Sequence, residues 1–475
     1  MTDLHFQSTV ELAKAIQTKS ITSVELLEVF KARYEKLNPD LNALVSERFK
    51  HALEEAKIAD KDLEKGKSRG PLHGVPITIK DNLEVKGFPC TAGSEDFKNH
   101  ISKKSADVVL SLKKAGAIVF AKSNLPRFGE DFQTYNDLYG TTNNPWDTTK
   151  TPGGSSGGAA AAVAAGMTSF EIGNDIGGSI RHPANFCGVY GHKPTFGIVP
   201  KRCIIPPPPG IFTGDYTLPA DILVNGPIAR APEDLDQIMD LIVQPEADNR
   251  KAWKIKLPAP KKKNLKEYKV GIWLDDPACP VDTRVLNRIQ RVVDSIANAG
   301  AQIEDRRPEV EFARAFKVFT TLLNSFMSAG TPQKLYDQWI EKEKELGSDQ
   351  DDYQTGFIKA SILRHRNWRL LDAERQILRQ KWAEYFEKFD VLLCPVTPVT
   401  AFDHDHGSWF KRTIEVNGKA LPYSNLLGWA GLTNSVYLPS TVAPIGISSN
   451  GLPIGIQIVA PYLGDKTSIH FAKLL

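Results

Sequence analysis

The chain has 475 residues, of which 41% are apolar and 24% charged, so it is long enough to bury a large core and has an ordinary globular composition. The net charge of +3 is small for this length, which argues against nucleic acid or an anionic membrane as partner. No apolar run reaches the ~18 residues of a membrane span, and the first residues lack the apolar core of a signal peptide. We therefore expect a cytoplasmic protein.

The cysteines support the same compartment. They are odd in number, scattered along the chain and never spaced as C-x-x-C, which argues against a disulfide scaffold or a zinc site. A reducing environment fits this usage. The five are Cys90, Cys187, Cys203, Cys279 and Cys394.

The chain opens with helix signals. Two capping boxes, Ser8 to Glu11 and Thr22 to Glu25, each precede apolar residues at helical spacing. His51–Lys65 reads as a third, highly charged helix. We expect residues 1–70 to form a helical segment that packs on the main domain.

The pattern then alternates between strands and helices. Val75–Ile79 and Ala117–Ala121 are predicted strands, and Ala106–Ala115 is a predicted helix between them. This order favours a mostly parallel sheet covered by helices. The polar, proline-bearing stretch 245–266 is a candidate joint between two halves. Phe312–Met327 reads either as a core helix or as the wall of a substrate channel.

Later strands are expected at residues 270–273, 391–394 and 454–459. The run Pro206–Pro209 is a stiff polyproline segment that we expect to form a rigid wall near the pocket.

The stretch Thr151–Ser179 is the most unusual part of the sequence. Two glycine-flanked serine sites, Gly153–Gly158 and Asp175–Ser179, lie on either side of the alanine-rich run Ala159–Ala165, which has high helix propensity. Glycines around a serine permit backbone conformations that a Cβ would forbid, and they leave N–H groups that can surround a developing anion. The pattern favours a serine nucleophile; the alternative is a pair of turns around a core helix.

Familiar serine sites do not fit this stretch. A G-x-S-x-G nucleophile elbow requires a strand directly before Ser155, and a phosphate-binding loop requires a lysine after the glycines. His182 and His192 lack an evident carboxylate neighbour, so we interpret both as structural hydrogen-bonding residues. His404 and His406 lack a third ligand, which makes them a weak metal signal.

A lysine is then the best candidate for the base, as in Ser-Lys variants of the triad. Lys80 follows the strand Val75–Ile79, and burial would lower its pKa enough for it to accept a proton. Taken alone, this segment favours an ordinary surface lysine at a strand edge. Because successive strand side chains point to opposite faces, Asp81 is not expected to pair with Lys80.

Over nearly its whole length the chain resembles the amidase signature family of serine hydrolases. The resemblance implies a single α/β/α domain over residues 1–475, with a large mixed β-sheet covered by helices, and neither a metal nor a cofactor. The residues that carry it are Gly74–Asp81, Gly153–Gly158, Gly173–Arg181, Phe186–Gly188, Lys193–Thr195 and Leu452–Gln457.

The resemblance also implies a Ser-cisSer-Lys triad. Ser179 is similar to the nucleophile, Ser155 to the bridging serine and Lys80 to a general base that is neutral in the resting enzyme. We therefore predict a cis peptide bond between Gly154 and Ser155. Asn174, where the family often has Thr or Ser, is a departure that leaves the triad untouched. The implied oxyanion hole consists of the N–H groups of Ile176, Gly177, Gly178 and Ser179, and the implied supporting residues are Ser156, Asp175 and Arg181.

The implied function is hydrolysis of a carboxylic amide, through an acyl-enzyme on Ser179, to an acid and an amine or ammonia. The residues after Thr195, Phe196–Pro200 and then the proline run, depart from the pattern of tRNA-dependent amidotransferase subunits, which favours a stand-alone amidase. Such a subunit, an esterase and a non-catalytic binding protein stay open as alternatives. We expect a small-molecule amide as the partner, no nucleic acid, no membrane, and a homodimer as an alternative to a monomer.

Overall fold

The computed structural model describes residues 4–205, 220–346 and 352–475. The predicted wall at Pro206–Pro209 lies outside the described residues. The described residues form a central eleven-stranded sheet and two small hairpins. In sheet order the strands are β1 (Leu44–Glu47), β3 (Ile118–Ser123), β2 (Pro76–Lys80), β6 (Phe170–Asp175), β8 (Val224–Ala229), β7 (Tyr190–Lys193), β14 (Ser440–Ile447), β15 (Pro453–Val459), β11 (Val391–Pro395), β9 (Lys269–Ile272) and β10 (Gln302–Glu304).

The hairpins join β4 (Tyr135–Asn136) to β5 (Gly140–Thr141) and β12 (Thr413–Val416) to β13 (Lys419–Pro422). The α-helices are α1 (Thr9–Gln17), α2 (Ser23–Leu41), α3 (Phe49–Glu64), α4 (Asp107–Lys114), α5 (Gly157–Ala164), α6 (Arg181–Cys187), α7 (Pro232–Ile242), α8 (Thr283–Asn298), α9 (Phe312–Met327), α10 (Gln333–Glu345), α11 (Tyr353–Ser361), α12 (His365–Phe386), α13 (Leu427–Asn434) and α14 (Asp465–Leu474).

The sheet is mixed, as the family resemblance implied. β3, β2 and β6 are parallel, and so are β11, β9 and β10 at the other end. All the pairs between β6 and β11 are antiparallel, so the strand–helix alternation near the N-terminus did not predict the middle of the sheet.

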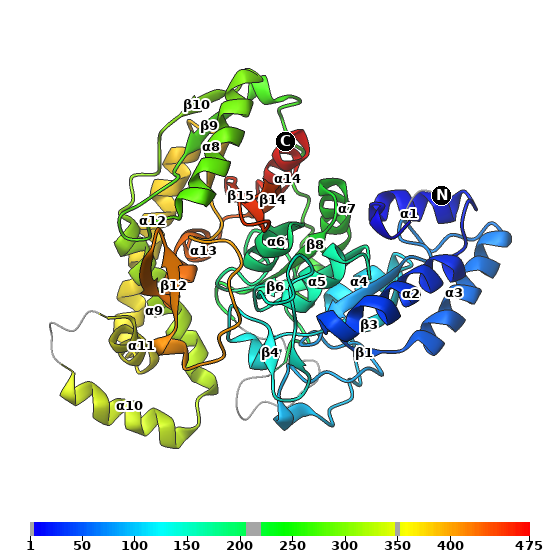
Figure 1. The fold of residues 1–475 in the computed structure, drawn as a ribbon, viewed down its shortest axis with the longest axis horizontal. Helices are drawn as coiled ribbons and strands as arrows, with labels where there is room; N and C mark the ends of the chain where they lie inside the picture. Colours follow the sequence, from blue (N-terminus) through cyan, green and yellow to red (C-terminus); the bar gives the residue numbers. More distant parts are fainter. Residues whose placement is uncertain (1–3, 206–219, 347–351) are drawn as a thin grey trace.

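The two halves of the sequence meet inside one continuous sheet. β7 lies at the edge of the strands from the first half, and it pairs with β14 from the C-terminal part of the chain. Figure 1 shows the N-terminal elements in blue and cyan on one side, the middle of the second half on the other, and β14, β15 and α14 in red between them. The stretch 245–266 lies between α7 and β9 and contains the short 3-10 helix Asn249–Lys251 and the start of another, Leu265–Glu267.

Helices cover both faces of the sheet. On β7, a Cβ built on Gly191 would meet Ala184 of α6. The next residue, His192, hydrogen-bonds Asp465 of α14. Because successive side chains of a strand point to opposite faces, α6 and α14 lie on opposite sides of the sheet.

The first 70 residues contain the three expected helices, α1 to α3, and both predicted capping boxes are present. They also contain β1, which was not predicted. Its four residues pair antiparallel with β3 and form one edge of the central sheet. A four-residue strand beside long helices carries too short an alternating pattern to be recognised in the sequence.

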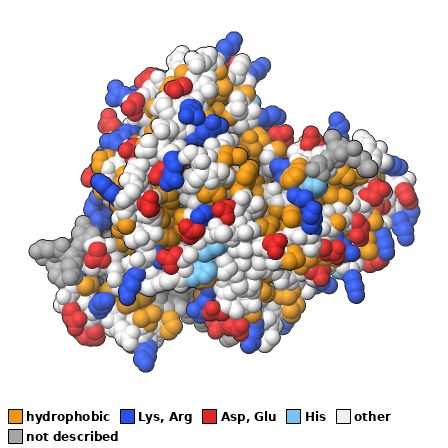
Figure 2. Space-filling model, in the orientation of Figure 1, with side chains coloured by type: hydrophobic (Ala, Val, Ile, Leu, Met, Phe, Trp, Pro, Cys, Tyr) orange, Lys and Arg blue, Asp and Glu red, His pale blue; other side chains and the backbone are white. Residues whose placement is uncertain are grey.

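The charged surface agrees with the small net charge. Figure 2 shows acidic and basic side chains interspersed over one face of the molecule. Among the described helices, none combines the length and the apolar character needed to cross a membrane.

Two glycines lie opposite each other where β6, β8 and β7 are neighbours in the sheet. Gly173 of β6 pairs with Gly226 of β8, and a Cβ on either glycine would lie close to the Ile180 side chain just before α6. A Cβ on Gly226 would lie 2.2 Å from the backbone oxygen of His192 and 2.6 Å from Pro194 Cδ. A neighbouring main chain cannot move aside cheaply, so this glycine is required by packing.

We therefore expect Gly226→Ala to lower the free energy of unfolding by at least the ~1–3 kcal/mol typical of an overpacked core. Gly356→Ala is the matched control, because Gly356 lies in α11, is exposed and has no atom within 4 Å of the position that a methyl group would take. That change should be neutral or stabilise by about 0.5–1 kcal/mol. Urea unfolding followed by circular dichroism measures both. Equal stability of the two variants would contradict the packing argument.

Candidate functional site

Lys80 is the last residue of β2, and its side chain is completely buried. In its protonated form the amine donates to the hydroxyl oxygens of Ser155 at 2.7 Å and Ser156 at 2.9 Å. It also donates to Asn174 Oδ1 at 2.7 Å. The predicted base and the predicted bridging serine are therefore in direct contact, and the surface-lysine interpretation is wrong.

Burial lowers the pKa of Lys80 to about 7, because the charged amine has lost its water. The nearby carboxylates of Asp175 and Glu171 oppose this shift without reversing it. Glu171 lies on β6 and accepts hydrogen bonds from Thr78 and Ser123, and burial raises its own pKa to about 7. An amine with such a pKa is partly neutral near pH 7 and can accept a proton.

Asp81 points away from Lys80, as strand alternation predicted. Its carboxylate lies 3.6 Å from Lys122 Nζ and accepts a 2.5 Å hydrogen bond from Thr91 Oγ1. Lys80 is therefore free of a direct carboxylate contact from its neighbour in sequence.

The loop before α5 brings Ser155 to Lys80. The peptide bond between Gly154 and Ser155 is cis, which confirms the prediction. Gly154 is packed so closely that a Cβ would lie 2.5 Å from the backbone oxygen of Asp131. Only glycine fits there, so this residue fixes the approach of the serine.

Ser155 and Ser179 line the same cavity, which has a volume of about 130 Å³. Its apolar walls come from segments far apart in the sequence. Phe326 and Met327 at the end of α9 belong to it, whereas Val318 and Leu322 of the same helix lie in the core. The core interpretation of Phe312–Met327 is thus confirmed for most of the helix, and its role as the wall of a substrate channel stays a prediction. The described lining consists of Asn82, Phe128, Gly129, Glu130, Ser155, Asn174, Ile176, Ser179, Ile204, Ile205, Leu223, Phe326, Met327, Ala329 and Gly330.

The loop after β6 presents backbone N–H groups beside Ser179, but one of the four predicted oxyanion donors is engaged elsewhere. The N–H of Gly178 donates to Asp175 Oδ1 at 2.8 Å, and that of Ile180 donates to Asp175 Oδ2 at 3.2 Å. Gly178 has φ +111°, a conformation that favours glycine. Asp175 therefore holds the loop in shape and engages the Gly178 N–H, and which amides form the oxyanion hole stays a prediction.

A buried ion pair anchors the same loop. Arg181 donates to Asp175 through Nε and Nη2 at 3.0 and 2.9 Å. Its Nη1 reaches Gln457 of β15 at 2.6 Å and Thr433 of α13 at 2.8 Å. Burial alone would raise the pKa of Asp175, but the guanidinium holds it well below its usual range. The predicted supporting residues Asp175 and Arg181 thus connect the serine loop to the second half of the chain.

The two histidines differ from each other. His192 hydrogen-bonds Thr441 and Asp465, as expected of a structural residue. His182 has no hydrogen-bond partner for either ring nitrogen among the described residues, so that part of the prediction is wrong. Its ring packs edge-on against Phe132, and burial lowers its pKa to about 3. A neutral imidazole can occupy an apolar site through its ring contacts.

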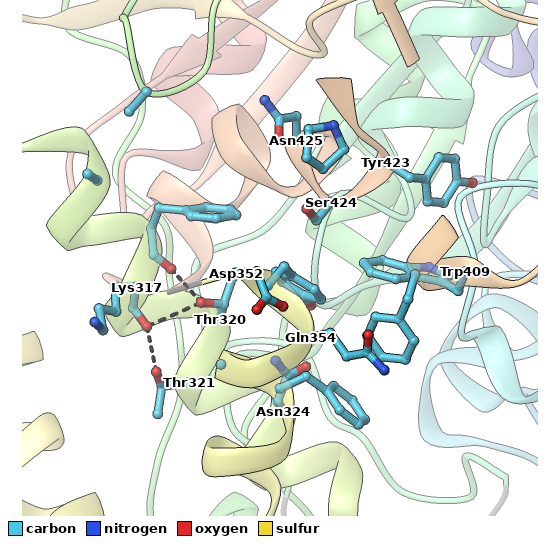
Figure 3. A pocket seen from close by; sticks show the side chains of 18 of the residues that line it. Lys317, Thr320, Thr321, Asn324, Asp352, Gln354, Trp409, Tyr423, Ser424 and Asn425 are labelled. Carbon is cyan, nitrogen blue, oxygen red and sulfur yellow. Dashed lines mark hydrogen bonds between the residues drawn. The ribbon is translucent and has the colours of Figure 1, made fainter. Parts of the chain in front are cut away.

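A larger cavity of about 490 Å³ lies between α9, α11 and residues 409–425. Trp409 and Tyr423 stand on one side of it, and Thr320 and Asn324 of α9 on another (Figure 3). None of the predicted catalytic residues, all of which are described, lines this cavity. The smaller cavity is therefore the candidate active site.

Metal ligands do not gather elsewhere in the described ranges. The rings of His404 and His406 are 5.7 Å apart, and no group of three or more His, Cys, Asp or Glu in the described part of the chain could hold an ion.

Two residues of the site were missed or undervalued in the sequence. Asn174 contacts Lys80 directly, although the sequence suggested only a neutral departure. Glu171 was not singled out, yet it is buried on β6 near the base. Glu171 could have been recognised from the sequence, because a carboxylate between Phe170 and Ile172 in an apolar strand must find hydrogen-bond partners inside the protein.

Comparison with known proteins agrees with this geometry. A profile of the family described as Amidase matches residues 25–469. The chain is 34% identical to the indoleacetamide hydrolase of Bradyrhizobium diazoefficiens, over 98% of this chain and 86% of that protein. It is 31% identical to fatty-acid amide hydrolase 2-A of Danio rerio, over 98% and 88%. It is also 31% identical to a glutamyl-tRNA(Gln) amidotransferase subunit of Deinococcus radiodurans, over 99% and 97%.

Solved structures give the same result for the fold. A bacterial aryl acylamidase of the amidase signature family superimposes with a TM-score of 0.80 and 25% identity, covering 99% of this chain and 96% of that one. The profile match and the relatives above 30% identity span nearly the whole chain, so this protein belongs to the amidase signature family.

Proposed function

We propose that this enzyme hydrolyses a small, neutral amide through an acyl-enzyme on Ser179, with Lys80 as the base and Ser155 as the proton relay. The observation that carries the proposal is the 2.7 Å contact between buried Lys80 and Ser155, in a cavity that Ser155 shares with Ser179. Family membership supports amide hydrolysis in general. The roles of individual residues are our proposal.

In the proposed reaction, the Ser179 oxygen attacks the amide carbon while its proton passes to Ser155, and the Ser155 proton passes to neutral Lys80. The carbon–nitrogen bond then breaks, and the leaving amine takes a proton back along the same path. Water then attacks the acyl carbon while its proton passes along the same relay to Lys80. The bond from that carbon to the Ser179 oxygen breaks, the acid is released, and the oxygen takes the proton back from Lys80 through Ser155. The lysine ends each cycle neutral.

The negative oxygen of the tetrahedral intermediate needs N–H donors already in place. We assign this role to the amides of Ile176, Gly177 and Ser179, because the Gly178 amide is held by Asp175. The Asp175–Arg181 pair supports the loop that carries these donors. Ser156 supports Lys80 by accepting a hydrogen bond from it.

The cavity favours an apolar substrate. Its walls include Phe128, Leu223 and Phe326, and no lysine or arginine appears in its described lining. The described lining offers no cation to pair with the carboxylate of free glutamine and already contains the carboxyl group of Glu130, so glutamine is unfavourable there. This argues against the alternative of an amidotransferase subunit, although such proteins are among the relatives.

We propose a reducing, cytoplasmic location, since all five cysteines are free and buried. A homodimer stays a prediction.

Ser179 should be the only serine to react with a fluorophosphonate. We expect one adduct by intact-mass spectrometry, located on Ser179 by peptide mapping. Ser179→Ala should abolish the adduct and lower the amidase rate by on the order of 10⁴-fold or more. Ser169→Ala is the control, because Ser169 is buried just before β6 and outside the cavity. An adduct that persists in Ser179→Ala would reject the assignment.

The amidase rate should follow the neutral fraction of Lys80. With a pKa of about 7, kcat/KM should rise with pH below 7 and level off above it. Lys80→Ala should remove this rise, the rising limb of the pH profile, and reduce kcat by roughly 10²–10⁴-fold. Lys80→Arg should not restore activity, because guanidinium stays protonated. A structural lysine predicts the opposite: activity in the arginine variant and an unchanged limb in both.

The purified chain alone should hydrolyse aryl and aliphatic amides in preference to glutamine. We expect kcat/KM for the best apolar amide to exceed that for glutamine by about 100-fold or more, since a buried unpaired charge is strongly disfavoured. The panel should include matched esters, because an esterase would cleave these far faster than amides. Glutamine hydrolysis that matches the best amide would favour the amidotransferase alternative.

A further inference from the structure

The three neighbours of Lys80 raise a question that the proposed triad leaves open. A protonated lysine has three N–H donors, but the neutral amine has two donors and one lone pair. Lys80 touches three oxygens, those of Ser155, Ser156 and Asn174. The oxygen that faces the lone pair must be the one that gives up its proton, so the orientation of the amine decides whether it can act as a base.

Asn174 cannot face the lone pair. Its Oδ1 is a carbonyl oxygen, which carries no proton, so Lys80 must donate to it across 2.7 Å. The amide is held in this orientation because its Nδ2 donates to Asn82 Oδ1 at 3.0 Å. One N–H of the neutral amine is therefore assigned.

Ser156 is assigned through the main chain of the same asparagine. Its hydroxyl donates to the Asn174 backbone oxygen at 3.4 Å. Because a hydroxyl has a single proton, the Ser156 oxygen can only accept from Lys80, at 2.9 Å. The second N–H of the neutral amine is assigned to Ser156.

Only Ser155 then remains to meet the lone pair. We infer that Asn174 is a positioning residue that directs the lone pair of the Lys80 amine at the Ser155 hydroxyl, through its side chain and through its backbone contact with Ser156. The inference rests on the proposed function and concerns one step of it, the removal of the Ser155 proton.

Several charged groups act on the same lysine. Asp175 and Glu171 of β6 stabilise its protonated form, while Asp81 and Lys122 form their own pair across β2 and β3. All four stay in place in the variants below, so a change in the pH limb reports on Asn174.

The test is the rate at which a fluorophosphonate labels Ser179 in the wild-type chain, in Asn174→Ala and in Asn174→Asp. The rate is measured from about pH 5 to 10, because this range brackets a depressed lysine pKa. This readout needs no knowledge of the natural substrate. In Asn174→Ala the ammonium loses an acceptor, so the limb should move to lower pH. The plateau should still fall by roughly 10- to 100-fold, because the hydrogen bond that orients the lone pair of the neutral amine is lost.

In Asn174→Asp the side chain keeps its shape and its acceptor oxygen but gains a negative charge beside Lys80. The limb should move to higher pH by about one unit or more, and the labelling rate should recover above it. Opposite shifts in two variants of one residue are not expected from a structural defect. Because Asp has nearly the same volume as Asn, this variant also keeps the test valid if Asn174→Ala fails to fold.

Asn225→Ala is the matched control. Asn225 faces Asn174 in the register of β6 and β8, is also buried, and donates to the Pro200 backbone oxygen at 2.9 Å. Its removal should leave the limb where it is in the wild type. Limbs that coincide with the wild type in both Asn174 variants would overturn the inference. A wild-type chain that is not labelled on Ser179 would instead overturn the proposed function, and this inference with it.

Discussion

The proposed chemistry depends on one constraint, the burial of Lys80 without a carboxylate in direct contact. Three carboxylates lie close in the fold, and each has other donors. Asp175 is held by Arg181 and by loop amides, Glu171 by two hydroxyl groups on neighbouring strands, and Asp81 by a threonine beside Lys122. With its solvent gone and its neighbours occupied, the amine loses the stabilisation of its charge. A direct ion pair at this position would stabilise the protonated amine and oppose the proposed role of Lys80 as a base.

The serine loop depends on both halves of the chain. Its backbone turns at Gly178, where only a residue without a Cβ is comfortable, and Asp175 holds the turn through two amide hydrogen bonds. Arg181 then ties that carboxylate to Gln457 of β15 and to α13. A buried guanidinium requires a full set of acceptors, and these come from residues 252 and 276 positions further along the sequence. The loop that carries Ser179, the proposed nucleophile, is thus held by a network that no local segment contains.

Local sequence predicted the parts of the site that local backbone determines. Glycines beside Ser155 predicted the tight loop and, with the family resemblance, the cis peptide bond; strand alternation separated Lys80 from Asp81. Contacts between distant strands were not predictable in this way. Whether Asn174 reaches Lys80 depends on the pairing of β2 with β6, and the loss of the Gly178 amide to Asp175 depends on how the loop closes. The antiparallel middle of the sheet was hidden for the same reason, since β7 finds its partner β14 in a distant part of the sequence.

The place of β14 and β15 in the sheet bears on how the protein is synthesised. Both strands leave the ribosome long after β7, yet they cover its free edge and complete the environment of Arg181. Until then, the growing chain carries an exposed strand edge, the feature that most readily pairs with other chains. It also lacks the acceptors that hold the serine loop. The roughly 250 intervening residues take about 12 to 50 seconds to make at ordinary elongation rates. The acceptors of Arg181 at residues 430, 433 and 457 are therefore added to the chain long after the loop that carries Ser179.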